Sequence, residues 1–254
     1  MWIDSHCHLD AAEFSADRDQ IVADARAAGV SHWVLPAVAT QQFAALREVC
    51  GRYPGCAPAY GIHPLYVASA GPNDLAQLAD WLRHEPAVAV GEIGLDFFVA
   101  DVDRQQQEFF FIEQLKIARE QGLPVLLHVR RSVDAVLKQL RRIKVLGGIA
   151  HAFNGSRQQA DEFIKLGFKL GFGGTLTYPG STRIRALAKE LPLSAIVLET
   201  DAPDMPPSFA AGQRNQPAYL PRFGEALAAL RNLPLSEVAA ATGRNVREVL
   251  PGLP

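Results

Sequence analysis

The chain contains little cysteine and no long apolar run. Its three cysteines, Cys7, Cys50 and Cys56, form no C-x-x-C pair, and an odd number without a framework is typical of a reducing compartment. No stretch approaches the roughly 18–20 uncharged apolar residues of a transmembrane helix. The first residues also lack a basic segment followed by an apolar one, which is the pattern of a signal peptide. We therefore predict a cytoplasmic protein without membrane contact.

Neither sign of charge dominates the chain. There are 25 Lys and Arg residues against 27 Asp and Glu residues, which gives a formal net charge of −2. This balance excludes a global positive field, so a nucleic acid partner would have to be contacted by local arginines or by metal ions. The hydrophobic fraction of 48% is ordinary for a globular protein, and a chain of 254 residues can form one α/β barrel. We expect a monomer.

Short apolar runs alternate with longer amphipathic segments. Strand-like runs occur at 2–6, 32–37, 57–61, 88–93, 124–128, 148–151, 168–171 and 195–199. Helical patterns cover 16–29, 41–52, 72–84, 104–121, 132–143, 156–166, 181–190, 219–231 and 235–249. This alternation predicts an α/β fold, a (β/α)8 TIM barrel that occupies residues 1–254 as a single domain. A doubly wound open sheet is the alternative, but no Gly-rich dinucleotide fingerprint follows the first predicted strand.

Histidines and carboxylates gather at the carboxyl ends of the predicted strands. Five of the seven histidines and two carboxylates have such positions: His6, His8, His63, His128, His151, Glu92 and Asp201. The H-x-H pair alone is a weak signal, although residues two apart in a strand point to the same face. A closed barrel brings its strand ends together, and so many ligands exceed the needs of one tetrahedral metal. They suit two ions about 3.5–4 Å apart that share a bridging carboxylate.

The motifs around these residues resemble the TatD family of metal-dependent hydrolases, within the amidohydrolase-like barrels. The matching segments follow the family order and are IDSHCHLD at 3–10, GIHP at 61–64, GEIGLD at 91–96, PVLLH at 124–128, HAFNG at 151–155, ETDAP at 199–203 and RNQP at 214–217. The resemblance implies that His6, His8 and Asp201 hold one divalent ion and that His128 and His151 hold a second. It also implies that Glu92 bridges the two ions, which could be zinc, magnesium or manganese.

The resemblance implies a hydrolase that acts on ester bonds, most simply a deoxyribonuclease or phosphodiesterase working from the 3′ end of single-stranded DNA or RNA. Its catalytic residues would be Asp201 as general base, Glu92, and His63 in contact with the substrate phosphate. Three departures from common family motifs leave the substrate open: Leu65 after His63-Pro, Ala152 after His151, and Gln216 in the RNQP segment. A carbonyl substrate is the alternative, either an ester or amide, including the ester of a misacylated tRNA. A third possibility is a binding protein that has lost catalysis.

Other side chains near the predicted strand ends are candidates for substrate binding. Arg130, Arg131 and Arg214 could contact phosphate through the planar guanidinium. Asp96 could bind substrate or orient a neighbouring ligand, and Phe97 and Phe98 could stack on a base. The proline-rich stretch 201–217 follows the last predicted strand and is expected to form a long loop over the active face.

Overall fold

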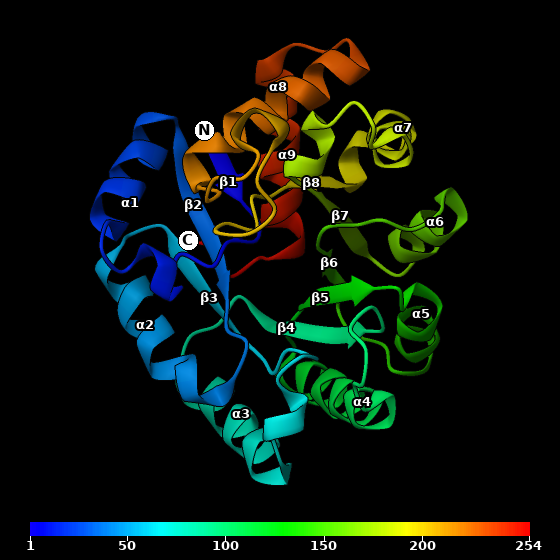
Figure 1. Ribbon diagram of the computed structural model, residues 1–254. Coiled ribbons are helices and arrows are strands. Elements are labelled where there is room, and N and C mark those ends of the chain that lie inside the picture. Colours follow the sequence, from blue (N-terminus) through cyan, green and yellow to red (C-terminus); the bar gives the residue numbers. More distant parts are fainter.

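The computed structural model describes residues 1–254 and forms a barrel of eight parallel strands in sequence order (Figure 1). The strands are β1 (Trp2–Asp4), β2 (Val30–Pro36), β3 (Cys56–Tyr60), β4 (Ala89–Asp96), β5 (Val125–Arg130), β6 (Gly148–Ala150), β7 (Phe168–Phe172) and β8 (Ile196–Leu198). Just after β1, the N–H of Ser5 donates to the carbonyl of Leu198 in β8 at 3.1 Å, and this contact links the first and last strands. The predicted single-domain (β/α)8 barrel is confirmed.

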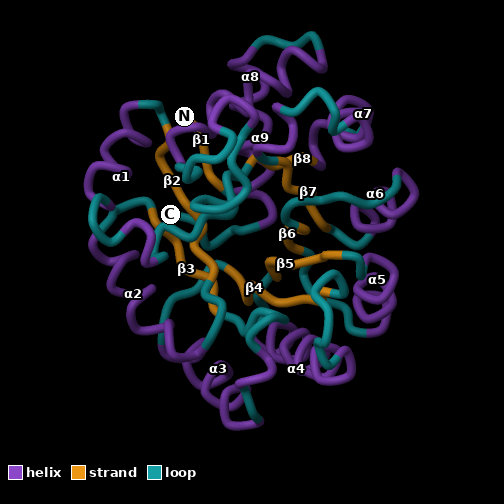
Figure 2. Tube along the Cα trace, viewed as in Figure 1, coloured by secondary structure: helices purple, strands orange, loops and turns teal.

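Helices surround the strands (Figure 2). They are α1 (Arg18–Ala27), α2 (Phe43–Arg52), α3 (Pro72–His84), α4 (Arg104–Gln121), α5 (Val133–Arg142), α6 (Arg157–Lys165), α7 (Thr182–Glu190), α8 (Leu220–Arg231) and α9 (Leu235–Val249). Local signals set the ends of α4, because Asp103 accepts hydrogen bonds from the N–H groups of Gln105 and Gln106 and Gly122 ends the helix at φ 64°. None of the helices combines the length and apolar character needed to cross a membrane.

The interior of the barrel is apolar at its amino end and polar at its carboxyl end. A buried cluster joins side chains from the strands, such as Val34, Leu126 and Ile149, to Val246 and Leu250 at the end of the chain. Helix α9 and the residues after it therefore close the amino end of the barrel. Two residues beyond Leu126, on the same face of β5, lies His128, so the polar layer begins directly above this apolar one.

Candidate metal centre

Side chains that lie within six of the strands or just after them meet toward the carboxyl end of the barrel, with the buried carboxylate of Glu92 at their centre. Its Oε1 atom lies 2.9 Å from Nδ1 of His128 and 3.0 Å from Nε2 of His151. Its Oε2 atom lies 3.2 Å from Nε2 of His6 and 3.8 Å from Nε2 of His8. The two oxygens of one carboxylate thus face two separate pairs of imidazoles.

Asp201 and His63 complete the cluster. The Oδ1 atom of Asp201 lies 3.6 Å from Nε2 of His6 and 3.7 Å from Nε2 of His8. On the other side, Nε2 of His63 lies 3.6 Å from Oε1 of Glu92. Three sets of potential ligand atoms have spacings that suit a metal ion: His6, His8 and Asp201; His6, Glu92 and His151; His63, Glu92 and His128. All predicted ligands are therefore brought together.

The H-x-H pair was predicted inside the first strand, but β1 ends at Asp4 and the pair follows it. Beyond the strand, backbone N–H groups alternate between two neighbours: Cys7 donates to Val34 in β2 at 3.0 Å, and His8 donates to Ala202 after β8 at 2.8 Å. No single partner strand continues the ladder, although both imidazoles still point to one centre, with ring centroids 5.1 Å apart. The Cys7 side chain is fully buried.

Asp4 holds the segment that carries Asp201 through hydrogen bonds to the preceding residue, Thr200. The buried carboxylate of Asp4 accepts hydrogen bonds from the N–H of Thr200 at 2.9 Å and from its hydroxyl at 2.5 Å. Asp201 itself has a left-handed backbone at φ 56°, and its N–H donates to the carbonyl of His6 at 2.8 Å. These contacts place the two halves of the His6, His8 and Asp201 set against each other, although they come from opposite ends of the chain.

His128 is oriented by a second carboxylate. Its Nδ1 atom faces Glu92, and its Nε2 atom lies 3.0 Å from Oδ2 of Asp96. The other oxygen of Asp96 accepts hydrogen bonds from the N–H groups of Phe98 and Val99 at 2.8 and 3.2 Å. Burial alone would raise the pKa of Asp96, but these hydrogen bonds outweigh it and hold the pKa at about 2. Of the two roles predicted for Asp96, the geometry supports orientation of a ligand.

The charges of the cluster centre on Glu92. Burial opposes its ionisation, but the surrounding imidazoles outweigh that effect and hold the pKa of Glu92 well below its usual range. Burial and the neighbouring His151 lower the pKa of His6 to about 3. Burial also disfavours the charged form of His151, yet the attraction of Glu92 prevails and raises its pKa to about 10. Glu92 is therefore ionised at neutral pH, and its negative charge favours a cation beside it.

The donor set fits metal ions. Both ring nitrogens of His6 and Nδ1 of His151 are buried without a hydrogen-bond partner, which is costly unless another group satisfies them. Imidazole nitrogens and carboxylate oxygens are the ligands of zinc and manganese, and carboxylates also suit magnesium. An additional carboxylate, Asp96, already orients one of the imidazoles, an arrangement that commonly supports metal-bound histidines.

Glu199 is a buried carboxylate to which the sequence assigned no role. Its Oε1 atom accepts the N–H of Ala152 at 2.5 Å and lies 3.8 Å from Nδ1 of His151. Its Oε2 atom has no hydrogen-bond partner. Space for it comes from Gly171 in β7, where a Cβ atom would lie 2.1 Å from Oε2. Glu199 belongs to the same E-T-D motif as Asp201, and this was the available sequence signal for its role. Its burial could not be predicted, because the space for it comes from Gly171 in another strand.

Two buried glutamines of α4 also support the site and were not predicted. Gln114 accepts the N–H of Ile62 at 2.7 Å and donates to its carbonyl at 3.0 Å, immediately before His63. Gln107 accepts the N–H of Asp96 at 2.9 Å. The helix thus holds the ends of β3 and β4. Gln107 and Gln114 lie on the apolar face of α4, and this position was the only sequence signal for their role. The residue type gave none, because most glutamines are exposed.

The three arginines differ in their surroundings. Arg130 is half-exposed, with its guanidinium 4.0 Å from Asp96 and 3.7 Å from the ring centre of Phe98. Arg131 approaches the same ring at 4.7 Å. Arg214 is instead engaged by the carboxylate of Asp17 at 3.1 Å and by the carbonyl of Glu13. Arg130 is therefore placed beside the cluster, whereas the predicted contact of Arg214 with substrate has no support from its position.

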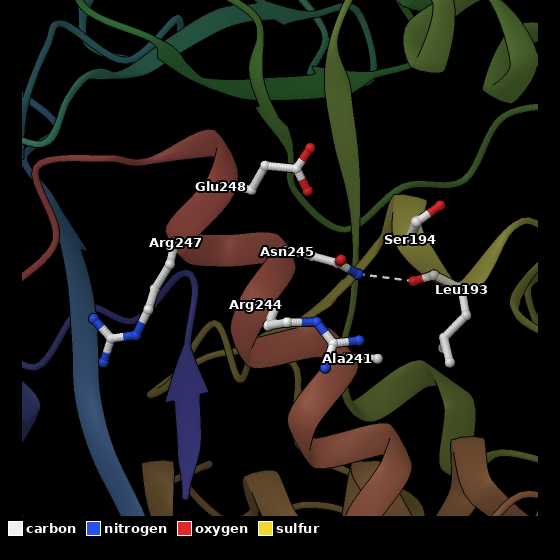
Figure 3. A pocket seen from close by; sticks show the side chains of 7 residues that line it. All are labelled: Leu193, Ser194, Ala241, Arg244, Asn245, Arg247 and Glu248. Atoms are coloured by element: carbon white, nitrogen blue, oxygen red, sulfur yellow. Dashed lines mark hydrogen bonds between the residues drawn. The ribbon is translucent and has the colours of Figure 1, made fainter.

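A cavity of about 420 Å³ opens beside the cluster and has His8, His63 and Glu92 in its wall. A larger cavity, of about 540 Å³, lies between α9 and the residues before β8, at the amino end of the barrel. Figure 3 shows that Arg244 and Arg247 point away from each other there, and that Asn245 donates to the carbonyl of Leu193, at 2.8 Å. Only the first cavity adjoins groups suited to catalysis.

A barrel with this donor set at the carboxyl ends of its strands defines the class of metal-dependent hydrolases. A family model described as TatD related DNase matches residues 3–251, so the chain belongs to the TatD family. It is 40% identical over 247 residues to the uncharacterized metal-dependent hydrolase YjjV of Escherichia coli K12, covering 96% of this chain and 95% of that protein.

Two further similarities agree with this assignment. The 3′-5′ ssDNA/RNA exonuclease TatD of Klebsiella pneumoniae is 34% identical over 247 residues, with 94% of each chain covered. The crystal structure of YjjV, a TatD homolog from Escherichia coli K12, superimposes with a TM-score of 0.95 at 39% identity over 98% of each chain. The resemblance recognised in the sequence is confirmed.

Proposed function

We propose that this metal-dependent hydrolase is a phosphodiesterase that removes nucleotides from the 3′ end of single-stranded DNA or RNA. The observation that carries the proposal is the placement of Glu92, whose two carboxylate oxygens face separate pairs of imidazoles and which lies, with His8 and His63, in the wall of a cavity. Paired metal sites with a shared carboxylate are common in enzymes that cleave phosphodiesters. The name of the Klebsiella relative supports the same substrate class.

The residues divide into two ligand sets. His6, His8 and Asp201 would hold one divalent ion, and His128 and His151 would hold the other. Glu92 would bridge them. Bound ions of this kind polarise a phosphoryl oxygen and lower the pKa of water toward neutrality.

Side chains of the protein accept the proton of the water and contact the substrate. Asp201 accepts a proton from the attacking water through the carboxylate that faces His6 and His8. The water oxygen bonds to phosphorus while the bond to the 3′ oxygen of the preceding nucleotide breaks, and that oxygen takes up a proton. The products are a nucleoside 5′-monophosphate and a strand shortened by one nucleotide. His63 contacts the scissile phosphate from the side of β3, and Arg130 contacts a neighbouring phosphate of the strand from the side of β5.

A carbonyl substrate is the second candidate. The cavity beside the cluster is lined by Asp10, Glu13 and Asp204 and by no lysine or arginine, which favours an uncharged or amine-bearing substrate. The same ligand set could support attack of water on an ester or amide carbonyl.

The test is an activity screen of protein reconstituted with magnesium, manganese or zinc. Substrates are single-stranded and double-stranded DNA, RNA and simple esters, and Glu92→Ala is the control. We expect mononucleotides from single-stranded oligonucleotides and a loss of at least about a thousandfold in Glu92→Ala. Absence of nuclease activity with all three metals would refute the proposal. Ester hydrolysis with intact oligonucleotides would select the carbonyl candidate.

A further inference from the structure

The charged side chains next to the metal centre differ between its two sides. The cavity beside the metal centre lies among the loops after β1, β2, β3 and β8, and its charged lining outside the cluster consists of Asp10, Glu13 and Asp204. The arginines of the mouth, Arg130 and Arg131, lie instead at the end of β5. Glu92 stands between the two sides, because it lines the cavity and also hydrogen-bonds to His128 on β5.

Arg18 and Arg214 attract Asp10 and Glu13 at longer range, but neither arginine forms a close ion pair with a carboxylate of the cavity. Arg18 donates to the backbone carbonyls of Leu9, Asp10 and Ala11, at 2.7, 3.0 and 3.1 Å. Arg214 pairs with the carboxylate of Asp17, outside the cavity. The Oδ1 atom of Asp10 is buried without a hydrogen-bond partner, whereas Glu13 and Asp204 are exposed. The carboxylates give the cavity wall a negative charge, which disfavours a phosphate group there.

The opposite side offers a platform suited to a nucleotide chain. The guanidinium groups of Arg130 and Arg131 lie 3.7 and 4.7 Å from the ring centre of Phe98, which is 46% exposed. Asp96 fixes the backbone of Phe98 through a hydrogen bond at 2.8 Å. An exposed aromatic ring can stack on a base, and the two guanidinium groups beside it can bind the phosphates of the same strand.

We propose that the carboxylate-lined cavity receives the terminal nucleoside with its free 3′-hydroxyl, while the Arg130 and Phe98 platform holds the strand upstream of the scissile phosphate. The inference rests on the proposed function and adds the direction in which the strand lies. A cavity of about 420 Å³ is within the usual size of a pocket for one small ligand. Sugar hydroxyls and base amino groups are donors that carboxylates accept, whereas a terminal phosphate would meet like charges.

The experiment compares oligothymidylates that differ only in a 3′-hydroxyl or a 3′-phosphate. Binding of 5′-fluorescein-labelled phosphorothioate versions is measured by fluorescence anisotropy, and hydrolysis of the phosphodiester versions gives kcat/KM. We expect at least about tenfold tighter binding and faster cleavage of the 3′-hydroxyl form, with a smaller difference at high salt. The double variant E13Q/D204N should reduce the discrimination several-fold. Glu225→Gln, an exposed change on α8, is the matched control.

Each outcome separates the two proposals. If no oligonucleotide is cleaved, the proposed function fails, and the binding preference still decides the orientation of the strand. Equal binding of both ends, tighter binding of the 3′-phosphate, or no binding of either would overturn the inference. Unchanged discrimination in E13Q/D204N would also overturn it, because the carboxylates would not be its source. Arg130→Gln should weaken binding of both ends by a similar factor, since it acts on the upstream strand.

Discussion

Two carboxylates contact the same imidazole of His128 from opposite edges, and they serve different purposes. Glu92 faces Nδ1, the nitrogen available to a metal, whereas Asp96 faces Nε2 and is anchored by two backbone N–H groups. A carboxylate held in this way fixes both the ring orientation and the tautomer. Asp96 is therefore a positioning residue, whose effect is exerted through His128.

Replacement of Asp96 by asparagine is expected to weaken metal binding by about 10–100-fold, because His128 loses a charged acceptor. Isothermal titration with zinc measures the affinity, and thermal unfolding of the metal-free variant reports any loss of fold. Asp101→Asn, in the same loop and exposed, should leave the affinity unchanged. Equal zinc affinities for Asp96→Asn and the native protein would rule out the positioning role.

The cysteines are expected to be inert in the native protein. Burial raises the pKa of Cys56 to about 12 and that of the Cys7 thiol well above its usual range. A thiol with a pKa near 12 is only about 0.01% thiolate at pH 8, and the thiolate is the reactive form. Ellman's reagent should therefore react slowly with the folded protein, faster as the pH rises toward 10, and rapidly with all three cysteines in guanidinium chloride. Rapid modification of native Cys56 at pH 8 would contradict this expectation.

Residue type and position near a strand end nominated the candidate ligands from the sequence, the resemblance divided them into two sets, and the structure brings them together. The orientation of each side chain was not predictable. The contact of Asp96 with His128 joins positions 32 residues apart, and Glu199 depends on space left by Gly171 in another strand. Such contacts depend on side-chain direction and on the register between strands, which a single sequence does not specify. The engagement of Arg214 by Asp17 was missed for the same reason.

At the scale of elements, the helices matched their predicted bounds most closely where end signals accompanied the periodicity. Helix α3 covers Pro72–His84 as predicted, with proline at its first position and Asp74 accepting the N–H of Gly71 at 2.9 Å. Helix α4 covers the predicted range between Asp103 and Gly122. The first strand ended earlier than predicted because its hydrogen-bond partners change after Asp4. Hydrophobic periodicity does not show where the hydrogen-bond partners of a strand change, so this boundary could not be predicted from the sequence.

Helix α4 also holds the segment after β3 that carries His63, through hydrogen bonds between Gln114 and Ile62. Replacing Gln114 by methionine, which is similar in length, would leave the N–H and carbonyl of Ile62 buried without partners. We expect a loss of about 2–6 kcal/mol in the free energy of unfolding, because each of the two unsatisfied buried groups costs about 1–3 kcal/mol. Urea unfolding measures the loss, and Gln105→Met, at an exposed position of the same helix, is the control. Equal stability of the two variants would show that Gln114 contributes no more than an exposed glutamine.

At the scale of the whole molecule, the two ends of the barrel are stabilised in different ways. The amino end is closed by apolar contacts between the strands and the C-terminal residues, among them Val246 and Leu250. The carboxyl end brings together buried polar groups, and several of their nitrogens have no partner within the protein. Metal ions bound there would connect the ends of β1, β4, β5, β6 and β8, which the cluster draws from distant parts of the sequence.

Removal of metal should therefore lower the thermal stability of the entire barrel. At a free metal concentration of about 100 times the dissociation constant, binding contributes about 2.7 kcal/mol to the free energy of unfolding. For a chain of this size that corresponds to a rise in Tm of about 5–10 °C over the protein treated with EDTA. Differential scanning fluorimetry with zinc, manganese or magnesium measures the shift. Glu92→Ala should lose most of it, because this change removes the ligand shared by both sets. An equal shift in Glu92→Ala would place the stabilising ion outside the cluster, and the absence of any shift with all three metals would mean that the cluster does not bind them in the folded protein.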